Sequence, residues 1–85
     1  MNDIEERLAF LIKREWEIRR TIYRDSIFRF DFGFDSLDFV GLASGIEEEF
    51  DIVLELGDDD ERLSKLKTVG EVALFVQQRI QQAAA

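Results

Sequence analysis

The sequence contains neither cysteine nor histidine. Without cysteine the chain cannot form disulfides or thiolate metal sites. Without histidine it lacks the usual general base, the usual zinc ligand and every Ser-His or Cys-His arrangement that activates a nucleophile. An enzyme made from this chain would have to work with carboxylates alone. We therefore expect no enzymatic activity and no metal site.

Long apolar runs are missing as well, because no stretch approaches the ~18–20 residues that a membrane-spanning helix needs. The first six residues include three acidic residues and no basic one, whereas a secretory signal begins with basic residues. A chain of 85 residues is long enough for one small core and too short for two. We expect a single domain over residues 1–85, located in the cytoplasm as a monomer without membrane insertion.

The net charge of −8 is concentrated in one part of the chain. Residues 31–61 contain twelve acidic residues and no Lys or Arg, whereas the segments on both sides are slightly basic. Such a field repels nucleic acid and attracts basic patches on partner proteins. We therefore expect protein partners with basic docking patches and no nucleic acid. The competing interpretation is a solvated acidic surface that only aids solubility.

Helical spacing of apolar residues predicts one amphipathic helix from Asp3 to about Trp16 and another from about Ser36 to Phe50. The second has a core stripe made of Phe39, Leu42, Ala43, Ile46 and Phe50. Its other face carries Leu37, Val40, Gly41, Ser44, Glu47 and Glu48. Exposed apolar residues beside glutamates are typical of a helix that faces a partner.

Two further helices are predicted in the C-terminal part. A short one around Asp59–Leu66 would bury Leu63 and Leu66. The last helix opens with Thr68-Val69-Gly70-Glu71, which fits the capping-box pattern. Residues 81–85 are expected to fray.

The segment from residue 17 to 35 is harder to interpret. Phe28, Phe30, Phe32 and Phe34 alternate with other residues, which is the pattern of a half-buried strand. Two observations argue against a strand. The sequence offers no second strand to pair with it, and Asp and Gly have poor strand propensity. Several of these rings are expected to anchor in the core, and Phe30 is a candidate exposed apolar contact.

The start of the second long helix carries the most informative motif, Asp35-Ser36-Leu37. Asp35 and Ser36 fall at the N-cap or first turn. The Ser36 hydroxyl is therefore either a cap or an attachment point, since no base lies nearby to make it a nucleophile.

The pattern D-x-G-x-D-S-L-D over residues 31–38, followed by a helix ending in E-E-E-F-D, resembles the acyl carrier protein family. The similarity runs from residues 4–7 to residues 68–69. It implies an all-α antiparallel four-helix bundle, with a short third helix and a long loop between the first two. Because the resemblance implies a loop over residues 17–35, we adopt a loop there in place of a strand.

The resemblance also implies a function. Ser36 would carry covalent 4′-phosphopantetheine, transferred from coenzyme A by a phosphopantetheinyl transferase (holo-carrier synthase), and the thiol of that group would hold acyl intermediates as thioesters. Asp35 and Leu37 would position the serine. The partner-binding residues would be Asp38, Val40, Glu47 and Glu48, which would meet acyl-transferring and condensing enzymes. Family members often carry a glutamate where this chain has Gly41 and a bulky apolar residue where it has Ser44, which points to a specialised carrier.

The resemblance leaves the pathway and two alternatives open. The cargo could belong to fatty-acid, polyketide or related lipid biosynthesis. One alternative is a peptidyl or aminoacyl carrier, which shares the fold, although the acidic helix and Asp35 before the serine favour acyl cargo. The other is an unmodified acidic protein-interaction module of the same fold.

Overall fold

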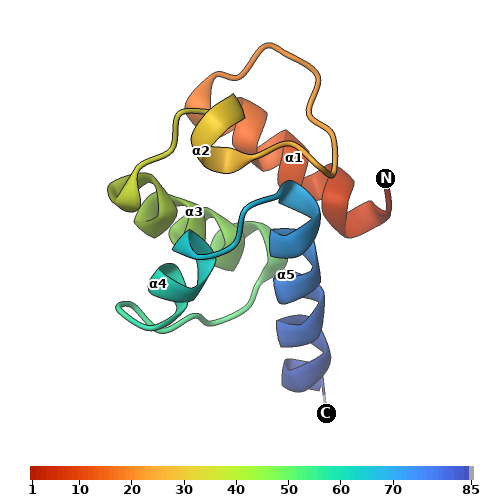
Figure 1. Cartoon of the computed structure of the whole chain (residues 1–85). Coiled ribbons are helices and arrows are strands. Elements are labelled where there is room, and N and C mark those ends of the chain that lie inside the picture. The colour runs from red at the N-terminus through yellow and green to blue at the C-terminus, as the bar shows by residue number, and fades with distance from the viewer. Residues whose placement is uncertain (85) are drawn as a thin grey trace.

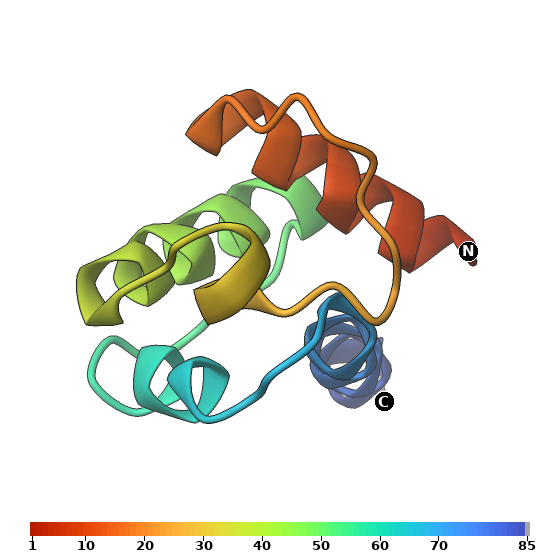
Figure 2. The ribbon, with the colours of Figure 1, turned by 45° about the horizontal axis from the view of Figure 1, so that its top comes forward.

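A computed structural model describes residues 1–84, and over these residues it contains helices and loops without a named strand (Figure 1). The helices are α1 (Asp3–Trp16), α2 (Phe28–Asp31), α3 (Ser36–Phe50), α4 (Asp59–Ser64) and α5 (Val69–Ala84). Figure 2 shows α1 and α3 running in opposite directions, with α5 crossing them and seen nearly end-on. The predicted all-α fold with a short helix before the last one is confirmed. The long loop between α1 and α3 contains one additional helical turn, α2.

Side chains at the helix starts explain where the helices begin. At α1 the Asn2 side chain accepts a hydrogen bond from the Glu5 backbone N–H, and the Glu5 carboxylate accepts one from the Asn2 N–H. At α5 only half of the predicted capping box forms. The Thr68 hydroxyl accepts from the Glu71 N–H, but the Glu71 carboxylate accepts from the Lys67 N–H instead of that of Thr68. The helix α5 continues to Ala84, through the region that was expected to fray, and Ala85 lies outside the described residues.

The four alternating phenylalanines lie on a helical turn and on the short loop that follows it. Phe28 opens α2 and Phe32, four residues on, is its C-cap, so their rings lie on the same side, with centroids 5.5 Å apart. Phe30 points the opposite way and is 83% exposed, as expected for an exposed apolar contact. Phe34 follows the turn and is buried against Phe28 and Phe39. The strand pattern was misleading because a strand would place all four rings on one face, whereas the helical turn directs Phe30 away from the core.

Two sets of contacts fix the long loop and α4. Backbone hydrogen bonds join Phe28 to Lys67 and Val69 to Ser26, which ties the entrance of α2 to the entrance of α5. Asp59 of α4 is buried and forms a bidentate pair with Arg79 of α5, at 2.9 and 3.0 Å. The pair lowers the pKa of Asp59, chiefly through the hydrogen bonds from Arg79. Leu63 of α4 is fully buried as predicted, and Leu66, which follows the helix, is half-buried.

Gly41 and Gly45 allow α1 and α3 to approach closely. A Cβ atom added at Gly41 would lie 3.4 Å from the Trp16 ring, which is an ordinary contact. A Cβ atom added at Gly45 would lie 3.0 Å from a methyl carbon of Leu11, closer than real Cβ atoms normally come to a neighbour. Gly45 therefore has a packing role that the sequence did not reveal.

Candidate functional site

The start of α3 is held by a capping box that does not use Ser36. Asp35 is the N-cap, and its carboxylate accepts a hydrogen bond from the Asp38 backbone N–H at 3.0 Å. The Asp38 carboxylate accepts from the Asp35 backbone N–H at 2.9 Å. Ser36 is the first helical residue and is exposed. The Ser36 hydroxyl therefore does not cap the helix, because Asp35 performs that role.

Asp38 also joins the start of α3 to the end of α1. The indole N–H of Trp16 donates a hydrogen bond to Oδ1 of Asp38, at 3.2 Å. The backbone N–H of Asp35 lowers the pKa of Asp38, burial opposes this, and the Trp16 hydrogen bond reinforces it. Both carboxylate oxygens therefore have partners inside the molecule. The contact of Asp38 with other proteins stays a prediction.

Two adjoining cavities extend from Ser36 along the side of α3 that faces α4. The first, of about 310 Å³, is lined by Ser36, Leu37, Val40, Gly57, Asp60, Glu61 and Ser64. The second, of about 280 Å³, is lined by Val40, Ala43, Ser44, Glu47, Leu54, Glu55 and Leu56. Val40 belongs to both. Together they form a groove, called here the Ser36 groove, between α3 and the segment of residues 54–64.

Most of the predicted site residues lie on or beside the Ser36 groove, whereas Glu48 lines a separate cavity between α1 and α3. Leu37 is 79% exposed and Val40 borders both cavities. Glu47 has an internal role that was not predicted, because its carboxylate accepts a hydrogen bond from the Leu54 backbone N–H at 2.9 Å. This bond holds the loop after α3 against the helix. Asp35 lies at the N-terminus of α3, where the Ser36 groove begins.

The opposite wall of the groove was missed by the sequence analysis. Leu54 is buried and Leu56 is 83% exposed, and both line the second cavity. A signal for them exists, since Ile52 and Leu54 are buried while Val53 between them is exposed. Such alternation in a connecting segment indicates an extended chain that lies against a core.

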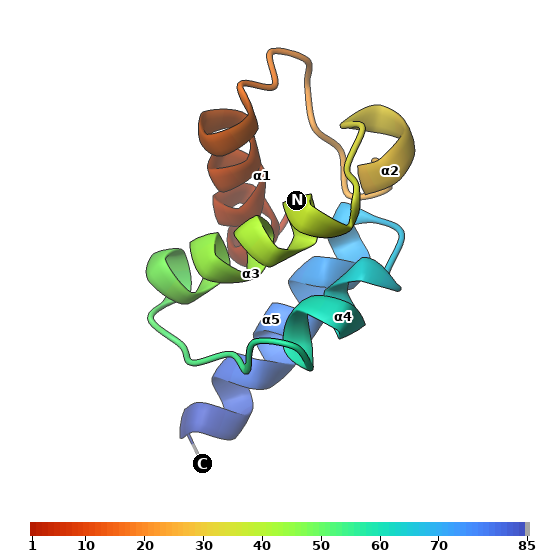
Figure 3. The same ribbon diagram turned by 90° about the vertical axis from the view of Figure 1, so that its left-hand side faces the viewer.

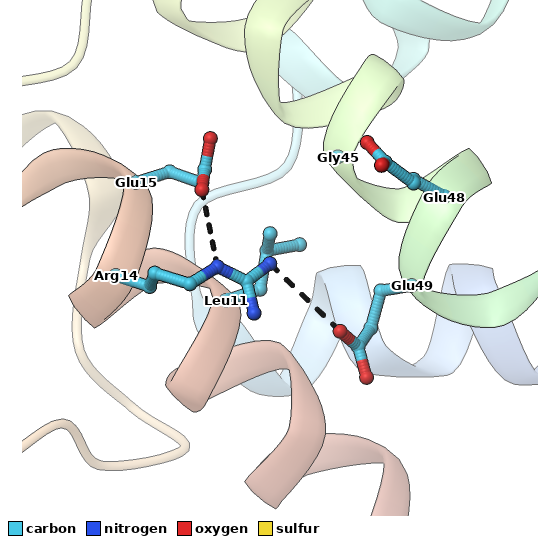
Figure 4. A pocket seen from close by; sticks show the side chains of 6 residues that line it. All are labelled: Leu11, Arg14, Glu15, Gly45, Glu48 and Glu49. Atoms are coloured by element: carbon cyan, nitrogen blue, oxygen red, sulfur yellow. Dashed lines mark hydrogen bonds and ion pairs between the residues drawn. The ribbon is translucent and has the colours of Figure 1, made fainter.

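Acidic residues on the α1 side of α3 differ in their availability. Figure 4 shows Arg14 of α1 between Glu15 and Glu49, and its Nη2 lies 3.9 Å from Glu49 Oε1. Arg7 also pairs with Glu49, at 3.3 Å. Glu48 is exposed, and no ion pair within residues 1–84 involves it. Glu48 is therefore the acidic residue of this group that is open to a partner.

The described residues add two observations on membranes and metals. No helix within residues 1–84 combines the length and apolar character required to cross a bilayer. Over the same residues no group of three or more carboxylates is arranged to hold a metal ion.

Comparisons with known proteins agree with the motif. Residues 6–76 match the family model described as phosphopantetheine attachment site. An acyl carrier protein of Buchnera aphidicola subsp. Acyrthosiphon pisum (strain Tuc7) is 39% identical over 80 residues, covering 93% of this chain and 95% of the relative. Acyl carrier protein 2 of Pseudomonas aeruginosa (strain PAO1) is 33% identical over 81 residues, covering 94% and 98%. An acyl carrier protein of Exiguobacterium sibiricum is 31% identical over 78 residues, covering 92% and 90%. The chain thus belongs to the acyl carrier protein family, whose members are non-enzymatic carriers with covalently attached 4′-phosphopantetheine.

Proposed function

We propose that Ser36 is the residue to which 4′-phosphopantetheine is attached, by a phosphopantetheinyl transferase that uses coenzyme A. The observation that carries this proposal is the geometry at the start of α3. The Asp35–Asp38 capping box fixes the backbone without the serine, so the Ser36 hydroxyl is exposed and free to react. Asp35 positions Ser36 through this box, and exposed Leu37 offers the transferase an adjacent apolar contact.

The residues around Ser36 fit this prosthetic group. When attached, the group supplies the thiol that the chain lacks and on which acyl groups are held. The serine opens onto the first cavity of the Ser36 groove, which leads to the second. The side chains of Val40, Ala43, Leu54 and Leu56 give the second cavity an apolar lining that would shelter an aliphatic chain.

Residues on both sides of α3 would bind partner enzymes. Glu47 and Glu48 lie in the segment without positive charge, so they would attract basic docking patches. Leu37 and Val40 would add apolar contact at the centre of such an interface. The negative charge of Asp38 would add to this attraction, although its carboxylate accepts hydrogen bonds from Asp35 and Trp16.

We propose acyl cargo for fatty-acid, polyketide or related lipid biosynthesis, handled by acyl-transferring and condensing enzymes. The apolar lining of the groove supports acyl over peptidyl or aminoacyl cargo. Ser44 leaves room in that groove, and Gly41, which faces Trp16, carries no charge where family members often have a glutamate, and both features support a specialised carrier. A monomer in the cytoplasm stays a prediction.

Intact-protein mass after incubation with coenzyme A and a promiscuous phosphopantetheinyl transferase tests the proposal. We expect a gain of one phosphopantetheinyl group in the wild-type protein and none in Ser36→Ala. Ser44→Ala and Ser64→Ala are matched controls, because both serines line the Ser36 groove and should not affect the gain. A gain that persists in Ser36→Ala would refute the assignment. A wild-type protein that is never modified would favour the unmodified interaction module.

A further inference from the structure

Arg29 is hydrogen-bonded to a residue that lines the cavity containing Ser36. It belongs to α2, and its guanidinium carbon lies 5.2 Å from the ring centroid of Phe39 in α3. Its Nη2 donates a hydrogen bond to the backbone carbonyl of Ser64, at 3.2 Å, and Ser64 lines the same cavity as Ser36. Figures 2 and 3 show α2 and α4 on the same side of α3, away from α1. Arg29 therefore connects three elements that meet beside Ser36.

The Arg29 guanidinium retains hydrogen-bonding capacity in this position. A guanidinium has five N–H donors in a planar fork, a shape that matches the oxygens of a phosphate group. The Ser64 carbonyl takes a hydrogen bond from one of its nitrogens. Within residues 1–84 no ion pair involves Arg29. The stacking on Phe39 and the bond to Ser64 hold the group in place while its charge has no anionic partner.

The charge distribution and the contact with Ser64 point to Arg29 as a cation for an anion on Ser36. A phosphodiester there would add negative charge to a stretch, residues 31–61, that has no Lys or Arg. Arg29 and Arg62 are the first basic residues on either side of that stretch. Arg62 lines a different cavity together with Asp59 and Arg79. Lys65 is already paired with Glu61, at 3.5 Å.

We propose that Arg29 binds the phosphodiester by which the prosthetic group is joined to Ser36, and so offsets its repulsion by Asp35 and Asp38. The inference rests on the proposed attachment at Ser36. It assigns the α2 turn a ligand-binding role in addition to its packing role. Charge-assisted hydrogen bonds from an arginine fork to phosphate oxygens are stronger than neutral ones. The first part of the prosthetic group would then be held on the α2 side of Ser36.

A thermodynamic cycle on the unmodified and loaded full-length protein tests this binding. The melting temperature is measured for both forms of the wild type, of Arg29→Gln and of Arg19→Gln, an exposed arginine in the same loop that serves as the control. At low salt, loading should raise the melting temperature of Arg29→Gln less than that of the wild type, or lower it more, and the two changes should differ by about 1–8 °C. In Arg19→Gln the change in melting temperature on loading should equal that of the wild type. Comparing loaded with unmodified protein removes the cost of losing the Phe39 and Ser64 contacts.

Two spectroscopic measurements complete the test. On loading, the Arg29 Nε–Hε resonance should shift in the wild type, and the ³¹P resonance should differ between the wild type and Arg29→Gln. At about 1 M salt, where the Debye length is about 3 Å, the loading difference between these two proteins should shrink. Normal loading with equal melting shifts and equal ³¹P resonances would overturn the role of Arg29 and leave the attachment intact. Absence of loading on Ser36 would instead overturn the proposed function and, with it, this inference.

Discussion

Substitution by alanine should affect the free energy of unfolding differently at the two glycines of α3 that face α1. In a helix interior glycine is less favourable than alanine by roughly 1 kcal/mol. At Gly41 the new Cβ would meet the Trp16 ring at 3.4 Å, so nothing opposes this gain. We expect Gly41→Ala to stabilise the protein by about 1 kcal/mol, which raises the melting temperature of a domain of this size by about 4–8 °C.

At Gly45 the same gain meets a steric cost. The new Cβ would lie 3.0 and 3.3 Å from the two methyl carbons of Leu11. Leu11 is only 1% exposed, so it cannot withdraw without displacing other core residues. Overpacking of this kind costs about 1–3 kcal/mol, which cancels or exceeds the gain in helix propensity. We therefore expect Gly45→Ala to be neutral or to destabilise the protein by up to about 2 kcal/mol.

Urea unfolding of both variants, monitored by far-ultraviolet circular dichroism, measures the two free energies. Leu11→Val removes the crowded methyl carbons, so the cost of Gly45→Ala should be smaller in the Leu11→Val background than in the wild type. Leu11→Val should leave the effect of Gly41→Ala unchanged. Equal stabilisation by both alanine substitutions would refute the argument that Gly45 sets the distance between α1 and α3.

Three other predictions concern the start of α3, the ion pair between α4 and α5, and the acidic surface of α3. Asp35→Ala should cost about 1 kcal/mol of unfolding free energy because it removes the N-cap, whereas Ser36→Ala should cost close to nothing, and equal costs in urea unfolding would contradict the assigned cap. Asp59, whose ordinary pKa is 3.8, has a lower pKa in the folded protein, so its pairing with Arg79 contributes fully above that value and is lost as the pH falls through the folded pKa. Asp59→Asn should therefore be less stable than the wild type at pH 7, and the difference should narrow under acid titration below about pH 4, whereas a gap that does not change with pH would exclude this linkage. Glu48→Lys should slow loading by the transferase most strongly at low salt, while Glu6→Lys on exposed α1 surface serves as the charge-matched control, and equal slowing by both would indicate a net-charge effect without a local docking site.

The long helices and the position of Ser36 could be predicted from the sequence because local rules determine them. The apolar stripe from Phe39 to Phe50 and the capping residue Asp35 fixed the bounds of α3. The alternation of Phe28, Phe30, Phe32 and Phe34 was ambiguous, because the burial of Phe28 and Phe34 fits either a strand or a helical turn and only the exposed Phe30 distinguishes them. The positions of Leu54 and Leu56 depend on how the loop after α3 folds back onto it. The internal bond of Glu47 depends on that same tertiary contact, so residue spacing could not reveal it.

The contact between Trp16 and Asp38 has a practical consequence for optical measurements. Trp16 is the only tryptophan in the chain, and its indole N–H is bonded two residues from Ser36 along the chain. Its ring also lies 4.7 Å from that of Phe34, in the segment that leads into α3. Indole emission depends on hydrogen bonding and on solvent access, so its wavelength should respond to changes at the start of α3. The protein thus carries an intrinsic fluorescent reporter that can follow loading and partner binding without an attached dye.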